Sequence, residues 1–486
     1  MSLLQGTDIA NLDSKEVKFL RSALTEKNPF MTTNGCLDWL EQRRKRTHIH
    51  IEQIPFAELK QWYLDENTGN LYHESKRFFS IEGISIKTNW GSVPEWSQPV
   101  INQPEIGILG IITREINGVL YFLMQAKIEP GNINYVQLSP TLQATKSNYT
   151  KVHKGETPEY LDFFLDDAKA VVLLDQLQSE QGARFLKKRN RNIIIEINED
   201  IPVKDNFCWL TLGQIITLMK YDNVVNMDTR TVISGIQFGS FSSEIIEFYK
   251  NIFFSQECYS EHYSDLLTSM LDNTRAVNTI DDVISWITKL KTKYELNVEK
   301  IPLNSVQGWK KNDNEIYHET RNYFSVIAVK VEIGSREVTS WTQPLVKASQ
   351  EGIIAYLVKK INGIYHFLVQ AKLEAGNFDI LEMAPTVQCI TGNFRNALPE
   401  GRPPFLDYVL AVKPEYIRYS TLQSEEGGRF YREQNKNLII EVDSAMPLEV
   451  PDNYIWMTLK QLKQFIKFNN YLNIQARSLL ASIGMK

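Results

Sequence analysis

The chain has 486 residues, a formal net charge of −5, 43% hydrophobic residues and 23% charged residues. This length exceeds one ordinary core and fits two or more domains, and the composition is typical of soluble globular proteins. The acidic balance argues against sequence-independent nucleic-acid binding, and no apolar run reaches the roughly 18 residues of a membrane span.

The cysteines and the first residues indicate the cellular compartment in which we expect the protein. Four cysteines lie far apart without CxxC spacing, a pattern typical of reduced thiols and not of disulfides or a zinc site. The opening "MSLLQGTDIANLDSKEV" lacks the basic and apolar regions of a secretory signal. We therefore expect a cytoplasmic protein without a metal centre.

The first half of the chain predicts a mixed α and β domain. In chain order, the patterns first predict a strand that ends in His73, a type I′ hairpin around Asn117-Gly118 and a strand over 168–177. They then predict a short helix over 179–190 with Ser179 as N-cap, a β-branched strand over 192–197 and a helix that starts at Thr211.

The second half repeats the first. "QAKIEPGN" (125–132) returns as "QAKLEAGN" (370–377), and "LQSEQGARF" (177–185) returns as "LQSEEGGRF" (422–430), both at an offset of 245. Flanking matches such as Arg230 and Arg477 have an offset of 247. A repeat of this length is a whole domain, so we place domains at 15–240 and 262–486 with a helical connector at 241–261.

Polar residues that recur are candidates for function, since packing alone rarely requires them. Alternation along the predicted strand places Gln125, Lys127 and Glu129 on one face, where a desolvated lysine could bind phosphate or act in acid/base chemistry. A solvated, salt-bridged sheet face explains the same pattern. His73 recurs as His318 and is a natural acid or base near neutral pH, although a structural histidine fits as well.

Two further stretches suggest anion binding. Glu180 and Arg184 lie at a predicted strand-to-helix junction, where helix N-termini and arginines bind phosphates; a capped helix with a Glu/Arg pair is the alternative. The loop 139–155 carries Lys146, Tyr149, Lys151 and Lys154, which could hold a diphosphate and stack on a base, or could simply be solvated. Motifs of Rossmann enzymes, P-loop NTPases, zincins and α/β-hydrolases are absent from the sequence.

Long strings of the chain resemble a known family. "HESKRFFSIEGI" (73–84), "FLMQAKIEPGN" (122–132), "VQLSPTLQATKSNYTKVHKG" (136–155) and "LQSEQGARFLKKRNRN" (177–192), with their second-half echoes, resemble the NDP-hexose 2,3-dehydratases of deoxysugar biosynthesis nearly end to end. The resemblance implies an α+β fold of two tandem Nudix-like α/β/α sandwich domains. "SEEGGRF" then looks like a worn Nudix signature without its preceding Arg-Glu, so metal-dependent hydrolysis is in doubt.

The resemblance also implies a reaction without a cofactor. The substrate would be dTDP-4-keto-6-deoxyglucose, which loses its C2 hydroxyl as water to give the 3,4-diketo-2,6-dideoxy sugar. We assign His73 as base or acid, Lys127 as enolate stabiliser or acid, and Glu129 as its partner. Substrate binding falls to Gln125, Gln143, Lys146, Tyr149, Lys151, Lys154, Glu180 and Arg184. The second half offers an equivalent pocket with His318, Gln370, Lys372, Glu374, Gln388 and Arg429.

Two other functions fit the residues. One is a Nudix-type nucleotide-sugar hydrolase, and the other is a non-catalytic nucleotide-sugar binding protein. The family further implies a homodimer and a 3-ketoreductase that acts next on the fragile diketo product.

Overall fold

The computed structural model describes residues 14–146, 157–166, 168–239, 261–272, 274–334, 340–390, 402–443 and 445–484. The predicted helical connector at 241–261 lies, except for its last residue, outside these ranges. Among the described residues, none of the helices has both the length and the apolar character that crossing a membrane requires.

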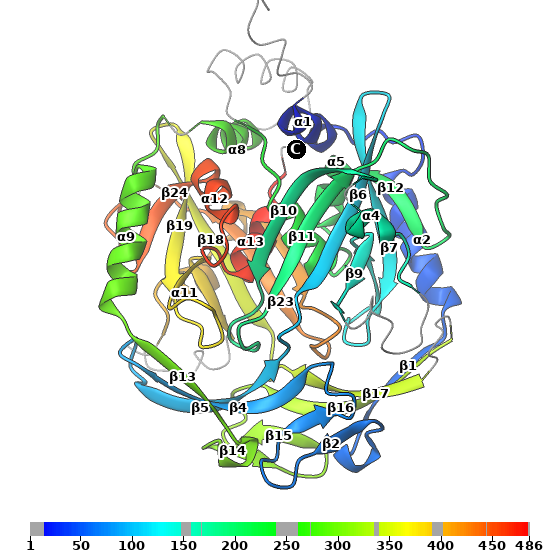
Figure 1. Ribbon diagram of the computed structural model, residues 1–486. Coiled ribbons are helices and arrows are strands. Elements are labelled where there is room, and N and C mark those ends of the chain that lie inside the picture. The colour runs from blue at the N-terminus through cyan, green and yellow to red at the C-terminus, as the bar shows by residue number, and fades with distance from the viewer. Residues whose placement is uncertain are drawn as a thin grey trace, which may run out of the picture.

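The first half builds a seven-stranded sheet, seen at the upper right of Figure 1. Its order is β10-β11-β6-β7-β12, with β8 on β7 and β9 on β6; only β11 and β6 run parallel. The strands are β6 (Gly107–Ile116), β7 (Val119–Ile128), β8 (Val136–Ser139), β9 (Leu142–Ala144), β10 (Val171–Ser179), β11 (Arg189–Glu196) and β12 (Phe207–Thr211).

The second half builds a matching sheet, at the upper left of Figure 1. Its order is β20-β19-β18-β23-β22, with β21 on β18 and β24 on β19, and β18 and β23 form the parallel pair. The strands are β18 (Gly352–Ile361), β19 (Ile364–Lys372), β20 (Glu382–Ala384), β21 (Val387–Ile390), β22 (Ile417–Ser424), β23 (Gln434–Glu441) and β24 (Tyr454–Thr458).

Two smaller sheets lie below the large ones and exchange strands (Figure 1). One combines β2 (Trp62–Leu64), β3 (Leu71–His73), β4 (Ser80–Thr88) and β5 (Glu95–Asn102) with β13 (Leu296–Ile301) from the second half. The other combines β14 (Trp309–Lys311), β15 (Glu315–His318), β16 (Ser325–Ile333) and β17 (Ser340–Lys347) with β1 (Ile49–Ile54) from the first half. Each half therefore completes a sheet of the other.

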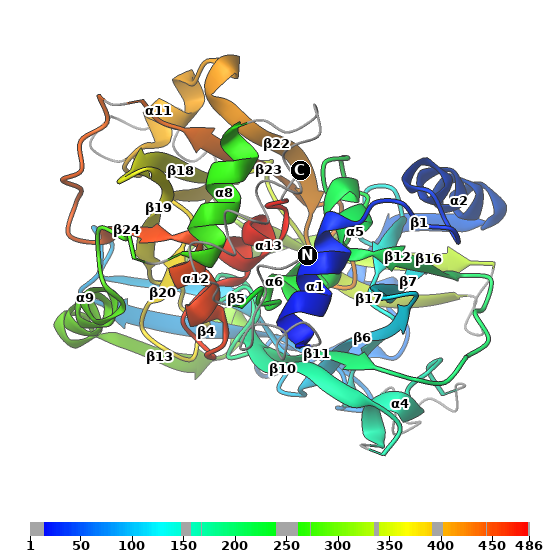
Figure 2. The same ribbon diagram turned by 90° about the horizontal axis from the view of Figure 1, so that it is seen from above.

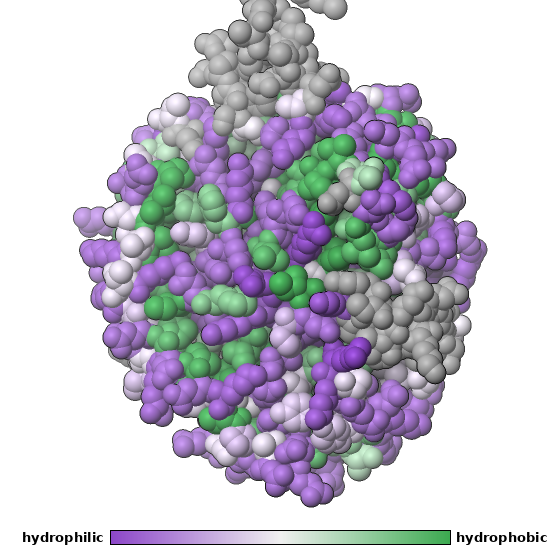
Figure 3. All heavy atoms as spheres, in the orientation of Figure 1, coloured by the Kyte–Doolittle hydropathy of each residue, from purple (hydrophilic) through white to green (hydrophobic). Residues whose placement is uncertain are grey.

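The helices cover the large sheets and meet at the centre. The first half has α1 (Lys15–Leu24), α2 (Thr33–Arg46), α4 (Asp162–Leu165), α5 (Leu212–Leu218) and α6 (Met227–Ser234); the second has α8 (Glu261–Leu271), α9 (Ile280–Lys293), α11 (Leu406–Ala411), α12 (Leu459–Ile466) and α13 (Ile474–Ala481). From above, α6 and α13 lie side by side (Figure 2). The face in Figure 3 is mainly hydrophilic, with hydrophobic residues scattered over it.

The two central helices carry a fully buried arginine each, and both arginines bond across the halves. Arg477 donates to the backbone carbonyls of Leu472 and Ser179 and, through Nε, to Thr231 Oγ1 at 3.2 Å. Arg230 donates to Ser478 Oγ at 2.7 Å and to the Ser424 carbonyl. Burial lowers the pKa of each guanidinium to about 10, so both remain charged near neutral pH.

Local patterns predicted several of the first-half elements. The hairpin is confirmed, with positive φ at Asn117 and Gly118 of 51° and 77°, and so are the strands β10 and β11. The helix that starts at Thr211 is confirmed as well, because the Thr211 hydroxyl and the Gln214 side chain form a capping box.

The predicted helix over 179–190 is wrong. Strand β10 continues to Ser179, turns follow, and β11 begins at Arg189. The reason is long-range: the Gly182 carbonyl accepts from Gly376 N–H at 2.7 Å, and Lys187 N–H donates to the Gly376 carbonyl at 2.6 Å. Backbone groups that a helix would pair internally bond the other half instead.

Gly131, which follows β7, contacts the backbone of the second half and leaves no room for a side chain. A Cβ on Gly131 would lie 1.7 Å from the Phe430 carbonyl oxygen. We expect Gly131→Ala to lower the free energy of unfolding by about 3 kcal/mol in urea titrations, since backbone must shift to admit the methyl group. Gly428→Ala is the control: its Cβ would meet only the Glu426 side chain, at 3.2 Å, and the first half has Ala183 there. Equal losses from both variants would contradict the close-approach argument.

A buried histidine makes the stability depend on pH. Nε2 of His366 accepts from the Val277 N–H at 3.1 Å, and Nδ1 faces the Ile364 carbonyl at 3.2 Å. Burial lowers the pKa of His366 below its ordinary value. The unfolded chain therefore binds the proton first, and we expect the free energy of unfolding to fall as pH drops below about 6.5. In His366→Tyr, which copies Tyr121 of the first half, this part of the pH dependence should vanish from denaturant titrations.

Candidate functional site

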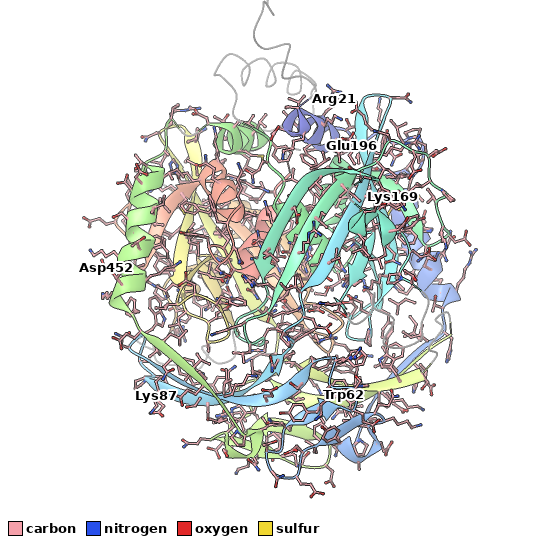
Figure 4. The ribbon with its side chains drawn as sticks, in the orientation of Figure 1. Arg21, Trp62, Lys87, Lys169, Glu196 and Asp452 are labelled. Carbon is pink, nitrogen blue, oxygen red and sulfur yellow. The ribbon has the colours of Figure 1, made fainter. Side chains whose placement is uncertain are left out.

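A cavity of about 1060 Å³ lies between the first-half large sheet and the two small sheets. The first half lines it with His73, Gln125, Lys127 and Gln143, together with Trp62, which Figure 4 labels in the lower layer. The second half lines it with Trp341, Thr342, Gln343 and Arg429. The cavity therefore gathers four of the predicted first-half residues and is completed by the other half.

The end of β7 brings two of the three motif residues to the cavity, as the alternation predicts, whereas Glu129 follows the strand. Gln125 and Lys127 face the cavity, and the carboxylate of Glu129, 5% exposed, lies behind it. Glu129 Oε1 accepts from Gln143 Nε2 at 2.9 Å, while Gln143 Oε1 accepts from Ser139 Oγ at 2.7 Å. These two bonds fix the orientation of the Gln143 amide.

His73 enters the cavity from the end of β3. Its Nδ1 accepts from the Ser75 N–H at 3.1 Å and lies 2.8 Å from Ser75 Oγ. A backbone donor at Nδ1 places the proton of the neutral ring on Nε2. Trp62 and Phe78 pack edge to face on the ring, with centroids 5.2 Å and 4.4 Å away, so the imidazole is held in one orientation.

Arg429 reaches this cavity because the turns cross between the halves. Gly131 N–H donates to the Gly427 carbonyl at 2.7 Å, and the Arg429 guanidinium stacks 4.1 Å above the Phe79 ring. The equivalent turn of the first half places Arg184 in the second half, where its guanidinium stacks 4.2 Å from the centroid of the Phe324 ring. This corrects the predicted grouping, which paired Arg184 with the first-half residues and Arg429 with the second.

Several buried charged groups near this cavity interact electrostatically with one another. Burial raises the pKa of Asp228 well above its usual range, and the Glu426 and Glu129 carboxylates add to the effect. Burial also raises the pKa of Glu426, although Arg429 opposes it. The pKa of Glu180 rises to about 7 through burial, while its Oε1 accepts from Asn190 Nδ2 at 2.7 Å.

Lys188 completes this group on the first-half side. It is 5% exposed, and burial lowers its pKa against the opposing effect of Glu180. Sequence reasoning missed Asp228 and Lys188, because it selected polar residues that recur, and it noted Glu426 only as part of the worn "SEEGGRF" signature. Their repeat counterparts are Gln475, Glu433 and Gln181, so the signal lay in positions where the halves differ in charge.

The second half repeats the inner geometry. Gln388 Nε2 donates to Glu374 Oε1 at 2.8 Å, and Lys372 Nζ donates to the Gln388 carbonyl at 3.2 Å. The Gln370 side chain hydrogen-bonds Tyr454, and the partly exposed His318 places Nδ1 2.8 Å from Thr320 Oγ1. Burial lowers the pKa of His318.

The basic loop is described only in part. Lys146 is exposed at the end of the described stretch, whereas Tyr149, Lys151 and Lys154 lie outside the described residues. Across the ranges that the structure does describe, no group of three or more His, Cys, Asp or Glu side chains could hold a metal ion.

Comparison with known proteins gives matches that cover both halves of the chain. The family model of the NDP-hexose 2,3-dehydratases matches residues 33–236 and 280–483. A protein of Saccharopolyspora spinosa named dTDP-4-dehydro-6-deoxy-alpha-D-glucopyranose 2,3-dehydratase is 45% identical over 466 residues, which cover 96% of this chain and 94% of that protein. Proteins of the same name from Amycolatopsis orientalis and Streptomyces violaceoruber are 43% and 42% identical, over 95% and 93% of this chain and 92% and 97% of theirs.

These matches confirm the tandem duplication and the resemblance that the sequence strings indicated. The two family matches lie at an offset of 247, as the flanking repeats do. The chain therefore belongs to the NDP-hexose 2,3-dehydratase family and is a carbon–oxygen lyase of the hydro-lyase type.

Proposed function

We propose that this enzyme removes the C2 hydroxyl of dTDP-4-dehydro-6-deoxy-α-D-glucopyranose as water and yields the dTDP-linked 3,4-diketo-2,6-dideoxy sugar. The observation that carries the proposal is the cavity between the halves, where His73, Lys127 and the Gln143 amide meet. The names of the three relatives, which align over nearly their whole length, give the substrate.

The chemistry needs few groups. The C3 hydrogen is adjacent to the C4 ketone, so a base can remove it and leave an enolate that donors or a cation stabilise. As the ketone re-forms, the C2–O bond breaks and the oxygen leaves with a proton from an acid. The resulting enol gains a proton at C2 and loses one from its C3 hydroxyl, which gives the diketone.

We assign these roles to first-half residues. His73 is the base or acid, because its ring lines the cavity in an orientation that aromatic packing and the bond of Nδ1 to Ser75 hold. Lys127 stabilises the enolate or protonates the leaving oxygen. Glu129 is its partner and also holds Gln143, so that Gln143 and Gln125 orient the sugar.

The nucleotide diphosphate needs cations at the cavity. Arg429 supplies one from the second half, in the place first assigned to Arg184, and Arg43 of α2 also lines the cavity. Lys146, Tyr149, Lys151 and Lys154, which follow the cavity residue Gln143 in the sequence, remain the proposed contributors of the loop.

We place the reaction in the first-half pocket. The carboxyls of Asp228 and Glu426 are buried and do not line the cavity, and the corresponding positions of the second half are the amides Gln475 and Gln181. An amide is neither an acid nor a base near neutral pH, so the second half lacks these two carboxyls, although it keeps His318, Lys372 and Glu374.

We also propose that the halves, 15–240 and 262–486, derive from a Nudix-like domain. The mixed sheets with one parallel pair in each half and the worn signature at 425–430 support this origin. A homodimer and a downstream 3-ketoreductase, which would consume the fragile diketone, complete the proposal.

The test is to incubate the purified protein with dTDP-4-dehydro-6-deoxyglucose without added metal and to follow the nucleotide sugar by mass. Loss of one water, or release of dTDP as the diketone decomposes, is the expected result. Unchanged substrate that still binds would mean a non-catalytic binding protein. Release of dTMP only after magnesium is added would mean a hydrolase.

A further inference from the structure

A serine in strand β8 distinguishes the two pockets. Ser139 is fully buried and stands opposite Gln125 in the register of β7 and β8. Its hydroxyl donates to Gln143 Oε1 at 2.7 Å. The repeat has Ala384 at this place, opposite the second-half counterpart of Gln125, so Gln388 receives no hydroxyl bond from it.

The Gln143 amide belongs to a chain of hydrogen bonds whose direction is fixed at both ends. At the start of α6 the Thr229 N–H donates to Asn226 Oδ1 at 2.9 Å, so Nδ2 is the atom of this amide that donates further. Nδ2 donates to Ser139 Oγ at 3.3 Å and to Gln143 Oε1 at 3.4 Å. At the other end, Gln143 Nε2 donates to Glu129 Oε1 at 2.9 Å. A backbone N–H only donates and a carboxylate only accepts, so the Gln143 amide cannot exchange its oxygen and nitrogen without losing these bonds.

These bonds decide what Gln143 can offer to a ligand. Its Oε1 accepts two bonds, which use both lone pairs, and Glu129 takes one N–H of Nε2. Among the described residues the second N–H has no partner, and Gln143 lines the cavity. The amide is therefore a donor toward a ligand and not an acceptor. In the described part of the second half, Gln388 Oε1 accepts a single bond, from Asn473 Nδ2 at 2.7 Å, and keeps a lone pair free.

Of the sugar oxygens at C2, C3 and C4, the C4 ketone suits such a donor best. The ketone only accepts, whereas the two hydroxyls also donate, and negative charge develops on the C4 oxygen when the C3 hydrogen is removed. We propose that the Gln143 amide donates to the C4 oxygen and that Ser139 is a positioning residue, which holds the amide in this orientation. The inference rests on the proposed function. With a neutral donor at the C4 oxygen, Lys127 can serve as the acid for the C2 oxygen.

The experiment is a double-mutant cycle of Ser139→Ala and Gln143→Met on the proposed substrate. Methionine keeps the length of glutamine without its donor, and we expect kcat to fall about 100-fold, as when one oxyanion donor is removed. Ser139→Ala should lower kcat ~10-fold, since Asn226 still holds the Gln143 oxygen. The KM should stay within about three-fold and Tm within about 3 °C. In the Gln143→Met background, Ser139→Ala should change kcat by less than about two-fold, because the serine acts through the amide.

A substrate deuterated at C3 tests which oxygen the amide binds. If the C4 oxygen loses a well-placed donor, removal of the C3 hydrogen slows. The isotope effect on kcat in Ser139→Ala should therefore be no smaller than in the wild type. A smaller isotope effect would mean that another step had slowed and would overturn the assignment to the C4 oxygen.

Ala384→Ser is the matched control. It adds a hydroxyl at the corresponding buried place of the second half, and its kcat should stay within about two-fold of the wild type. Wild-type turnover with unchanged kcat in Ser139→Ala would overturn this inference alone, as would a further ~10-fold loss in the Gln143→Met background. An equal loss in Ala384→Ser would do the same, because substitutions in this layer would then act on the whole structure. A wild type without turnover would overturn the proposed function and this inference with it.

Discussion

Replacing Lys127 by methionine is expected to lower kcat about 10³-fold, because the variant lacks both the cation beside the developing enolate and an acid for the leaving oxygen. Methionine keeps most of the aliphatic stem, so packing at the end of β7 should persist. The KM should change by less than about five-fold, since Arg429, Gln125 and Gln143 still line the cavity. Steady-state kinetics and dTDP binding by calorimetry measure the two effects separately.

The second half provides the control for this prediction. Lys372 holds the matching place on β19, with Nζ donating to the Gln388 carbonyl at 3.2 Å. Lys372→Met should leave kcat within about three-fold of the wild type if chemistry belongs to the first-half pocket. A larger loss from Lys372→Met than from Lys127→Met would assign the reaction to the second half.

The largest effect on stability is expected at Arg477. Arg477→Met removes donors from two backbone carbonyls and Thr231 Oγ1 and takes the positive charge away from Glu382. Breaking a buried network of this kind costs about 3–5 kcal/mol of the free energy of unfolding. Chemical denaturation followed by tryptophan fluorescence measures the loss. Arg477→Lys keeps the charge but not the fork of donors, so its free energy of unfolding should lie between those of the wild type and Arg477→Met.

Arg21→Met is the surface comparison. Arg21 lies on the upper rim of the molecule (Figure 4) and donates from Nη1 to the Gly118 carbonyl at 2.8 Å. Its removal should cost less than about 1 kcal/mol. If Arg477→Met were no more destabilising than Arg21→Met, the contacts between α13 and the β10–β11 turn would not contribute to holding the halves together.

Short-range patterns predicted the elements that short-range forces determine. The Asn117-Gly118 hairpin and the Thr211 helix start follow from φ preferences and a capping box within a few residues. The turn after Ser179 was mistaken for a helix because its decisive partner, Gly376, lies far along the chain. The sequence did not predict the exchange of strands between the small sheets either. Strands β1 and β13 occupy matching places in the repeat, so the pattern of each strand fits either small sheet.

The site was predicted in the same uneven way. Recurrence found His73, Lys127 and Gln143, which do line one cavity. It passed over Asp228, because a search for shared residues discards those that distinguish two copies. It also assigned Arg184 and Arg429 by sequence neighbourhood, whereas the crossing turns deliver each arginine to the other half.

The exchange of β1 and β13 has a consequence for the history of the chain. Without the second half, β4 would lose its partner β13 and become an open edge, and the same holds for β16 without β1. Once the strands had changed places, neither copy could be discarded, even if its own pocket no longer had a reaction to perform. Natural selection would then preserve the second copy as a scaffold while its pocket residues drifted, and a chain cut between the halves should stay together as one particle.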